Sequence, residues 1–176
     1  AMERTPDHVA KNRAAWAVHS VGFEEPGRKS WSTDKITWGN WSVPEDALGA
    51  LGDLSWFQGK SVVELGCGTA YFSAWLARRG ARPVGIDVTP EQLANARKFQ
   101  REFGLEFPLI EGNAEQTPFP NETFDLALSE YGASIWCDPA VWIPEAARIL
   151  RPGGVLVFLR NSPLSLMCTL GEGVAD

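Results

Sequence analysis

Two acidic residues and a pair of glycines are the residues of this sequence that could bind a nucleoside. Glu64 lies near the end of an apolar run, Gly66 and Gly68 follow it, and Asp87 comes twenty-one residues after Gly66. Glycines after a strand let the backbone turn sharply and approach a ligand closely, and the start of the next helix offers unpaired N–H groups. A carboxylate at the end of the next strand can accept hydrogen bonds from both ribose hydroxyls. This pattern therefore predicts a nucleoside ligand.

The same residues argue against a dinucleotide. In a G-x-G-x-x-G fingerprint that begins at Gly66, the third glycine position is Tyr71. Glu64 would also lie close to a pyrophosphate, and the like charges would repel one another. A nucleotide-dependent oxidoreductase is therefore disfavoured. The carboxylate of Glu64 suits a ligand with positive charge at that end, such as S-adenosylmethionine, which carries a sulfonium and an ammonium group and no phosphate.

The elements that must position these residues alternate along the chain. Strands are expected at 60–65, 82–88, 107–113 and 123–130, and after a turn within 151–160; helices are expected at 70–80, 89–104 and 138–150. Such alternation predicts an α/β fold, Rossmann-like and doubly wound, with a mostly parallel sheet and helices on both faces. The strand segments are continuous apolar runs, which is typical of strands covered on both faces. Ligands of such sheets bind beyond the carboxyl ends of the strands.

Helix caps divide the rest of the chain. A first helix should run from Pro6 to about Val18, followed by a loop over 21–41. Ser42 and Glu45 fit a capping box for a second helix, and Thr89 with Gln92 and then Asp138 are expected to cap later helices. We expect a helical and loop segment at 1–58, which could act as a lid, a nucleoside-binding core at 59–160 and a remnant at 161–176.

Four motifs occur in a fixed order from Val62 to Leu159. They are "VVELGCGTAYFSAWLARRG", "VGIDVTPEQLANAR", "EGNAEQTPFPNETFDLALSEYG" and "ARILRPGGVLVF". Together they resemble the motifs of the class I S-adenosylmethionine-dependent methyltransferases. The chain is most similar to the branch that acts on small molecules, which includes the ubiquinone and menaquinone biosynthesis type. The antiparallel strand pair that normally ends the sheet of this family has no counterpart in the sequence.

The resemblance implies which residues contact the cofactor S-adenosylmethionine. The methionine moiety would be bordered by Glu64, Gly66, Cys67, Gly68 and Ser129. The adenosine would meet Asp87 at the ribose diol, Val88 at the adenine ring, Asn113 at the adenine amino group and the backbone N–H of Ala114. Two positions depart from the family pattern, since Ala70 stands at the third glycine and Asn113 replaces the usual aspartate. A side-chain amide can still accept a hydrogen bond from an amino group through its oxygen.

Methyl transfer displaces a sulfonium leaving group, so the enzyme mainly aligns the reactants in a dry site, an effect worth about 7–11 kcal/mol. An oxygen or nitrogen nucleophile can also need a base. Glu130 is the candidate catalytic base, and Tyr131, His8 and His19 are alternatives. The acceptor pocket is expected to be lined by Tyr131, Ile135 and Trp136, and by Trp38 or Trp41 from the N-terminal segment. An equal alternative is that these two tryptophans pack the N-terminal helices onto the sheet.

The composition of the chain argues against a nucleic acid partner, a membrane span and a metal site. The net charge of −6 disfavours a nucleic acid partner, which usually requires a basic face. The sequence contains no run of about 18 apolar residues, so no membrane span is expected. Three separated cysteines and two histidines predict no metal site and suit reduced thiols in a cytoplasmic protein.

The last strand would leave an exposed sheet edge. We expect a truncated sequence, or else a second subunit over this edge, as in a homodimer. A small-molecule methyltransferase is the leading hypothesis, and a catalytically silent S-adenosylmethionine-binding sensor is its rival.

Overall fold

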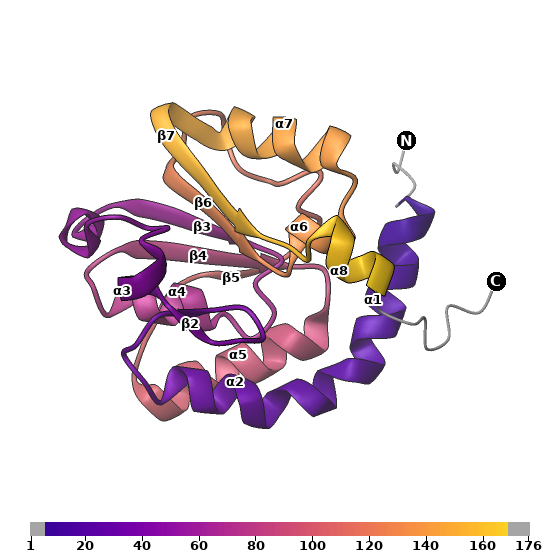
Figure 1. Ribbon diagram of the computed structural model, residues 1–176, viewed down its shortest axis with the longest axis horizontal. Helices are drawn as coiled ribbons and strands as arrows, with labels where there is room; N and C mark the ends of the chain where they lie inside the picture. The colour runs from indigo at the N-terminus through magenta and orange to yellow at the C-terminus, as the bar shows by residue number, and fades with distance from the viewer. Residues whose placement is uncertain (1–5, 169–176) are drawn as a thin grey trace.

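A parallel sheet of five strands forms the centre of the computed structural model, which describes residues 6–168 (Figure 1). The strands are β3 (Ser61–Leu65), β4 (Arg82–Asp87), β5 (Leu109–Glu111), β6 (Phe124–Glu130) and β7 (Leu150–Leu159). Their order is β5-β4-β3-β6-β7, and every neighbouring pair is parallel. The predicted Rossmann-like sheet is therefore confirmed. The direction of winding reverses between β3 and β6, which is where open sheets of this kind bind ligands.

Helices cover both faces of the sheet. They are α4 (Tyr71–Ala77) and α5 (Pro90–Phe103) on one face and α7 (Pro139–Ile149) on the other (Figure 1). Successive residues of β3 point to opposite faces. Val62 packs with Phe72 of α4, whereas Val63 packs with Trp142 of α7. Both valines are fully buried, which explains why the strand is a continuous apolar run.

The N-terminal segment is more ordered than the sequence predicts. It contains α1 (Asp7–His19), the short helix η1 (Ser20–Phe23), α2 (Glu24–Trp31), the paired strands β1 (Thr37–Trp38) and β2 (Val43–Pro44), α3 (Glu45–Leu48) and η2 (Leu54–Phe57). The expected loop over 21–41 is therefore wrong, because it includes α2. This helix ends in Trp31, which is fully buried and stacks on Phe103 and Phe107. The indole N–H of Trp31 donates to the carbonyl oxygen of Thr69 at 2.8 Å.

One of the three predicted caps is confirmed. The carboxylate of Asp138 accepts from the N–H of Ala140 at 2.8 Å and caps α7. Neither predicted capping box forms. Thr89 precedes α5 without a side-chain cap bond. Ser42 does not cap α3, which begins after Pro44.

Glu45, the expected partner of Ser42, is buried and accepts hydrogen bonds from outside its own helix instead. Its carboxylate accepts from the indole N–H of Trp38 at 2.5 Å and from the N–H of Leu51 at 2.6 Å. The helix that it begins has only four residues, because Gly49 takes a left-handed φ of 67° directly after Leu48.

The chain passes directly from α7 into β7, which begins at Leu150, and the expected turn is an irregularity within this strand. Leu150 pairs with Phe124 but the next pair is Val155 with Leu126, and Gly153 between them takes a left-handed φ of 80°. A short helix, α8 (Pro163–Cys168), follows β7. Within residues 6–168 no antiparallel strand pair follows β7, and the rest of the expected remnant at 161–176 lies outside the described residues. No helix in this part of the chain has the length and apolar character needed to cross a membrane.

Candidate active site

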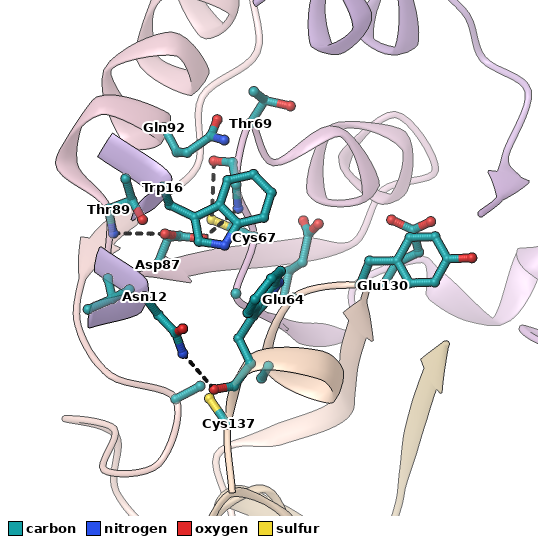
Figure 2. A pocket seen from close by; sticks show the side chains of 18 of the residues that line it. Asn12, Trp16, Glu64, Cys67, Thr69, Asp87, Thr89, Gln92, Glu130 and Cys137 are labelled. Atoms are coloured by element: carbon teal, nitrogen blue, oxygen red, sulfur yellow. Dashed lines mark hydrogen bonds between the residues drawn. The ribbon is translucent and has the colours of Figure 1, made fainter. Parts of the chain in front are cut away.

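A cavity opens at the carboxyl ends of β3, β4 and β6 (Figure 2). The empty space within it is about 1120 Å³, open solvent at its mouth included. The residues predicted for cofactor or acceptor that line it are Glu64, Gly66, Cys67, Gly68, Asp87, Val88, Asn113, Ala114, Glu130, Tyr131 and Trp136. The fold therefore brings most of the predicted site into one cavity.

The glycine turn after β3 is shaped by its neighbours. The N–H groups of Gly66 and Cys67 both donate to the carbonyl oxygen of Ile86, at 2.9 and 3.0 Å. A Cβ atom on Gly66 would lie 2.5 Å from the backbone nitrogen of Ala133, so only glycine fits there. At Gly68, by contrast, no heavy atom other than those of Gly68 and its two chain neighbours lies within 4 Å of the place of a Cβ. This residue leaves open space where a ligand can approach the backbone.

Ala70, which departs from the family's third glycine, has left-handed backbone angles, with φ 58° and ψ 36°. Such a conformation costs a residue with a Cβ about 1–2 kcal/mol. Its methyl group is fully buried and packs in one cluster with Trp31 and Ala74. The turn thus keeps the geometry that glycine takes easily, and burial of the methyl group offsets part of the strain.

Asp87 joins the glycine turn to the start of α5. Its Oδ2 accepts from the N–H of Gly68 at 2.7 Å, and its Oδ1 accepts from the N–H of Thr89 at 2.8 Å. Burial raises the pKa of this carboxyl, while these hydrogen bonds lower it. Each carboxylate oxygen can accept a further hydrogen bond. The side chain can therefore hold the loop and still receive ribose hydroxyls.

Glu64 is buried in the wall of the cavity. Its Oε2 accepts from the N–H and the hydroxyl of Ser73, at 2.8 and 2.5 Å. Its pKa is raised to about 8, mainly by burial; the charges of Glu130 and Asp87 add to this rise, and the bonds to Ser73 oppose it. In Figure 2, Glu64 lies between Asp87 and Glu130. A cationic ligand group beside Glu64 would favour its ionised form.

Glu130 forms the end of the cavity wall at β6. Its Oε1 accepts from the N–H of Gly39 at 2.8 Å, and its Oε2 accepts from the hydroxyl of Tyr71. Burial raises the pKa of Glu130, whereas these two donors lower it. The pKa of Tyr71 is raised well above its usual value by burial and by the charge of Glu130. The two donors therefore hold the carboxyl group of Glu130 at the cavity, where this group can exchange a proton with a ligand.

Two of the expected cofactor contacts are already engaged within the protein. Oδ1 of Asn113 accepts from the N–H of Glu115 at 3.0 Å. Ser129 is fully buried, donates to the carbonyl oxygen of Leu65 at 2.8 Å and accepts from the N–H of Ser134 at 3.1 Å. It does not line the cavity. Ser129 therefore links Leu65 to Ser134, and the structure does not place it at the expected contact with the methionine portion.

Three expected acceptor residues also lie outside the cavity lining, namely Trp38, Trp41 and Ile135. Trp38 is buried and packs on Phe72 with ring centroids 4.6 Å apart, which agrees with the packing alternative. The side chain of Trp41 is 89% exposed. The two histidines considered as bases do not line the cavity either.

Sequence reasoning missed the wall that α1 and η1 contribute. Trp16 makes edge contacts with Trp136 at 5.5 Å and with Phe23 at 5.1 Å between ring centroids. The amide of Asn12 donates to the carbonyl oxygen of Trp136 at 2.9 Å. The one available signal was Trp16, a large aromatic residue within a charged helix. Tyr71, Thr69 and Gln92 of the lining were also missed as site residues.

The lining fits a cationic nucleoside cofactor. Among residues 6–168, no lysine, arginine or histidine lines the cavity, whereas Glu64, Asp87 and Glu130 do. Gln92 also lines it, and its Oε1 is buried without a hydrogen-bond partner in the described part of the chain. Buried polar atoms normally have partners. An unpaired amide oxygen and an acidic wall both suit a ligand that carries positive charge and hydroxyl or amino donors. No group of His, Cys, Asp or Glu in the described ranges could hold a metal ion.

Comparisons with known proteins agree with this geometry. A family model described as a methyltransferase domain matches residues 63–158. A fatty-acid O-methyltransferase of Mycolicibacterium smegmatis is 34% identical over 108 residues, which cover 60% of this chain and 39% of that protein. A demethylmenaquinone methyltransferase of Thermus thermophilus is 36% identical over 106 residues, which cover 59% and 48%. This chain thus spans less than half the length of both relatives.

The fold is shared with solved structures as well. A crystal structure of an S-adenosylmethionine-dependent methyltransferase from Mesorhizobium loti superposes with a TM-score of 0.50 at 28% identity, over 62% of this chain and 55% of that one.

Proposed function

The chain belongs to the class I S-adenosylmethionine-dependent methyltransferases, and we propose that it transfers a methyl group from this cofactor to a small-molecule acceptor. The observation that carries the proposal is the cavity at the switch point of the sheet, with acidic side chains and no basic ones among its described lining residues. The names of the relatives refer to different acceptors, fatty acids and a demethylmenaquinone among them. They therefore support methyl transfer more strongly than any one acceptor.

The chain's own residues would bind the cofactor through two carboxylates. Asp87, fixed by the N–H groups of Gly68 and Thr89, would accept the ribose hydroxyls. Glu64 would lie beside the ammonium and sulfonium groups, whose charge favours its ionised form. Gly68 leaves space for the cofactor next to its backbone. Asn113 and Ala114 line the same cavity and would lie at the adenine.

When bound, the cofactor supplies the methyl group and a thioether leaving group. The residues at the end of β6 would serve the acceptor. Glu130 would receive the proton that the nucleophile loses, and Tyr71 would orient its carboxylate through the hydrogen bond to Oε2. Tyr131 and Trp136 would border the acceptor and help to exclude water. Alignment in a dry site is the main contribution expected from the protein, worth about 7–11 kcal/mol.

A thermal unfolding experiment with added ligands tests the cofactor assignment. A ligand present at a hundred times its dissociation constant stabilises the folded state by roughly 2.7 kcal/mol. S-adenosylmethionine and S-adenosylhomocysteine should raise the melting temperature, whereas NAD should not. A shift with NAD alone would contradict the proposal. Incubation with methyl-labelled cofactor and a metabolite extract would then separate an enzyme, which yields labelled product, from a silent binding module.

A further inference from the structure

The charge balance of the cavity bears on what the acceptor is. Glu64, Asp87 and Glu130 each accept hydrogen bonds from backbone N–H or hydroxyl groups and form no ion pair within residues 6–168. Burying carboxylates without cations is costly, because their hydration is lost. A functional site commonly retains such a cost because a ligand offsets it.

Basic side chains of α1 do not neutralise the cavity. His8 bonds to Glu115 at 2.7 Å, and Arg13 pairs with Glu111 at 2.7 Å. Neither of these basic residues is part of the cavity lining. These two basic side chains therefore do not compensate the acidic side chains of the wall.

The cofactor compensates only part of this acidic wall. S-adenosylmethionine carries a sulfonium, an ammonium and a carboxylate, which leave it with one net positive charge beside three acidic side chains of the wall. In the proposed function, Asp87 and Glu64 bind the cofactor. Glu130 remains, at the end of β6, where Tyr71 and the N–H of Gly39 hold its carboxylate from two sides. An acidic acceptor would place a further negative charge beside these acidic side chains, in a cavity whose described lining residues include no basic one to offset the repulsion.

We propose that the acceptor is an amine, recognised as a cation by Glu130 and by aromatic rings of the same cavity. This inference rests on the proposed function and names the acceptor class. Tyr71, Tyr131 and Trp136 line the same cavity, and aromatic faces attract ammonium groups. The bound ammonium gives a proton to Glu130, and the neutral nitrogen then attacks the methyl carbon. The new N–C bond forms as the C–S bond breaks, so the sulfonium becomes a neutral thioether and the positive charge passes to the methylated amine.

Three probes of similar size test the class: 2-phenylethylamine, 2-phenylethanol and 3-phenylpropionate. Calorimetry at neutral pH would first measure S-adenosylhomocysteine binding to the full chain, and then the binding of each probe to the saturated complex. We expect the amine to bind at least tenfold more tightly than the acid, with the alcohol between them. Glu130→Gln should abolish this preference, whereas the exposed Glu106→Gln, which makes the same chemical change outside the cavity, should keep it.

The outcomes separate the two proposals. If S-adenosylhomocysteine does not bind, the proposed function fails and the amine inference fails with it. If S-adenosylhomocysteine binds, but the acid binds as well as the amine or no probe binds at millimolar concentration, the amine inference alone fails. A preference for the amine that persists in Glu130→Gln would also overturn it, because the selectivity would then come from elsewhere.

Discussion

The hydroxyl of Tyr71 donates a hydrogen bond to Oε2 of Glu130, and this bond joins the first residue of α4 to the last residue of β6. Tyr71 occupies the position where a dinucleotide fingerprint requires glycine. The residue that argues against a pyrophosphate site therefore also lines the cavity. Because both groups are largely buried, removing either one should change the protonation of the other.

Tyr71→Phe should raise the pKa of Glu130. Burial raises that pKa in the wild type, and the Tyr71 hydroxyl lowers it by stabilising the carboxylate. Without the hydroxyl the carboxyl should keep its proton to higher pH. A ¹³C NMR titration of glutamate-labelled protein would follow the Glu130 carboxyl carbon. Tyr131→Phe is the matched control, since it removes a phenol from the same cavity, and a pKa of Glu130 that stays fixed in Tyr71→Phe would contradict the assignment.

The stability of the ligand-free protein should fall between pH 5 and pH 8 because of Glu64. Burial raises the folded-state pKa of Glu64 from its usual value of 4.5 to about 8. In this interval the folded protein holds a proton that the unfolded chain releases, so the stabilisation present below pH 4.5 is lost as the pH rises through 8. Urea unfolding at a series of pH values would measure the decrease.

Glu64→Gln should reduce this decrease, since the amide does not titrate. Burial raises the pKa of Asp87 and Glu130 in the same direction, so part of the slope should remain. Glu106→Gln, on the exposed surface, should retain the wild-type slope. An unchanged slope in Glu64→Gln would show that this carboxyl is not the source.

Asp87→Ala should weaken binding of S-adenosylhomocysteine by about 1.5–3 kcal/mol, because charge-assisted hydrogen bonds to the ribose are lost. It should also lower stability, since the N–H groups of Gly68 and Thr89 lose their acceptor. Asp53→Ala provides a control, because Asp53 likewise accepts from a nearby N–H, that of Ser55, but lies outside the cavity. Calorimetry on both variants would separate the two effects, and equal affinity in Asp87→Ala and the wild type would refute the ribose contact.

Gln92→Met should stabilise the ligand-free protein by about 1 kcal/mol, because it removes a buried acceptor that has no partner within the described residues. For a chain of this size that corresponds to a rise of roughly 2–4 °C in melting temperature. Gln100→Met on the same helix should act in the opposite direction, since the amide of Gln100 donates to the carbonyl oxygen of Phe107 at 2.7 Å. If both variants lose stability alike, Gln92 is satisfied by another group.

The sheet could be predicted because its strands are continuous apolar runs, and the parallel register then places their ends together. Leu65 pairs with Ile86, so the turn after Glu64 and the carboxylate of Asp87 become neighbours without any knowledge of the loops. It was harder to predict which side chains at the end of β6 face the cavity. Side chains alternate along a strand, so Ser129 points between β3 and α6 (Ala133–Trp136) while Glu130 reaches the cavity.

Features that depend on distant contacts could not be predicted. Helix α2 has no clear apolar period, and it is anchored by Trp31, whose partners Phe103 and Phe107 lie more than seventy residues later. The wall made by Trp16 likewise exists only because α1 packs beside Trp136. Neither relationship leaves a local pattern in the sequence.

Trp16→Ala should speed dissociation of S-adenosylhomocysteine, because α1 would lose its ring contacts over the cavity. Trp16 meets Trp136 and Phe23 edge-on, and such pairs contribute about 0.5–1.5 kcal/mol each. Loss of one such contribution from the closed state would accelerate release roughly two- to tenfold. Stopped-flow displacement would measure the rate, with Trp41→Ala as the control because that side chain is 89% exposed and outside the cavity. Equal release rates in the two variants would mean that α1 does not act as a lid.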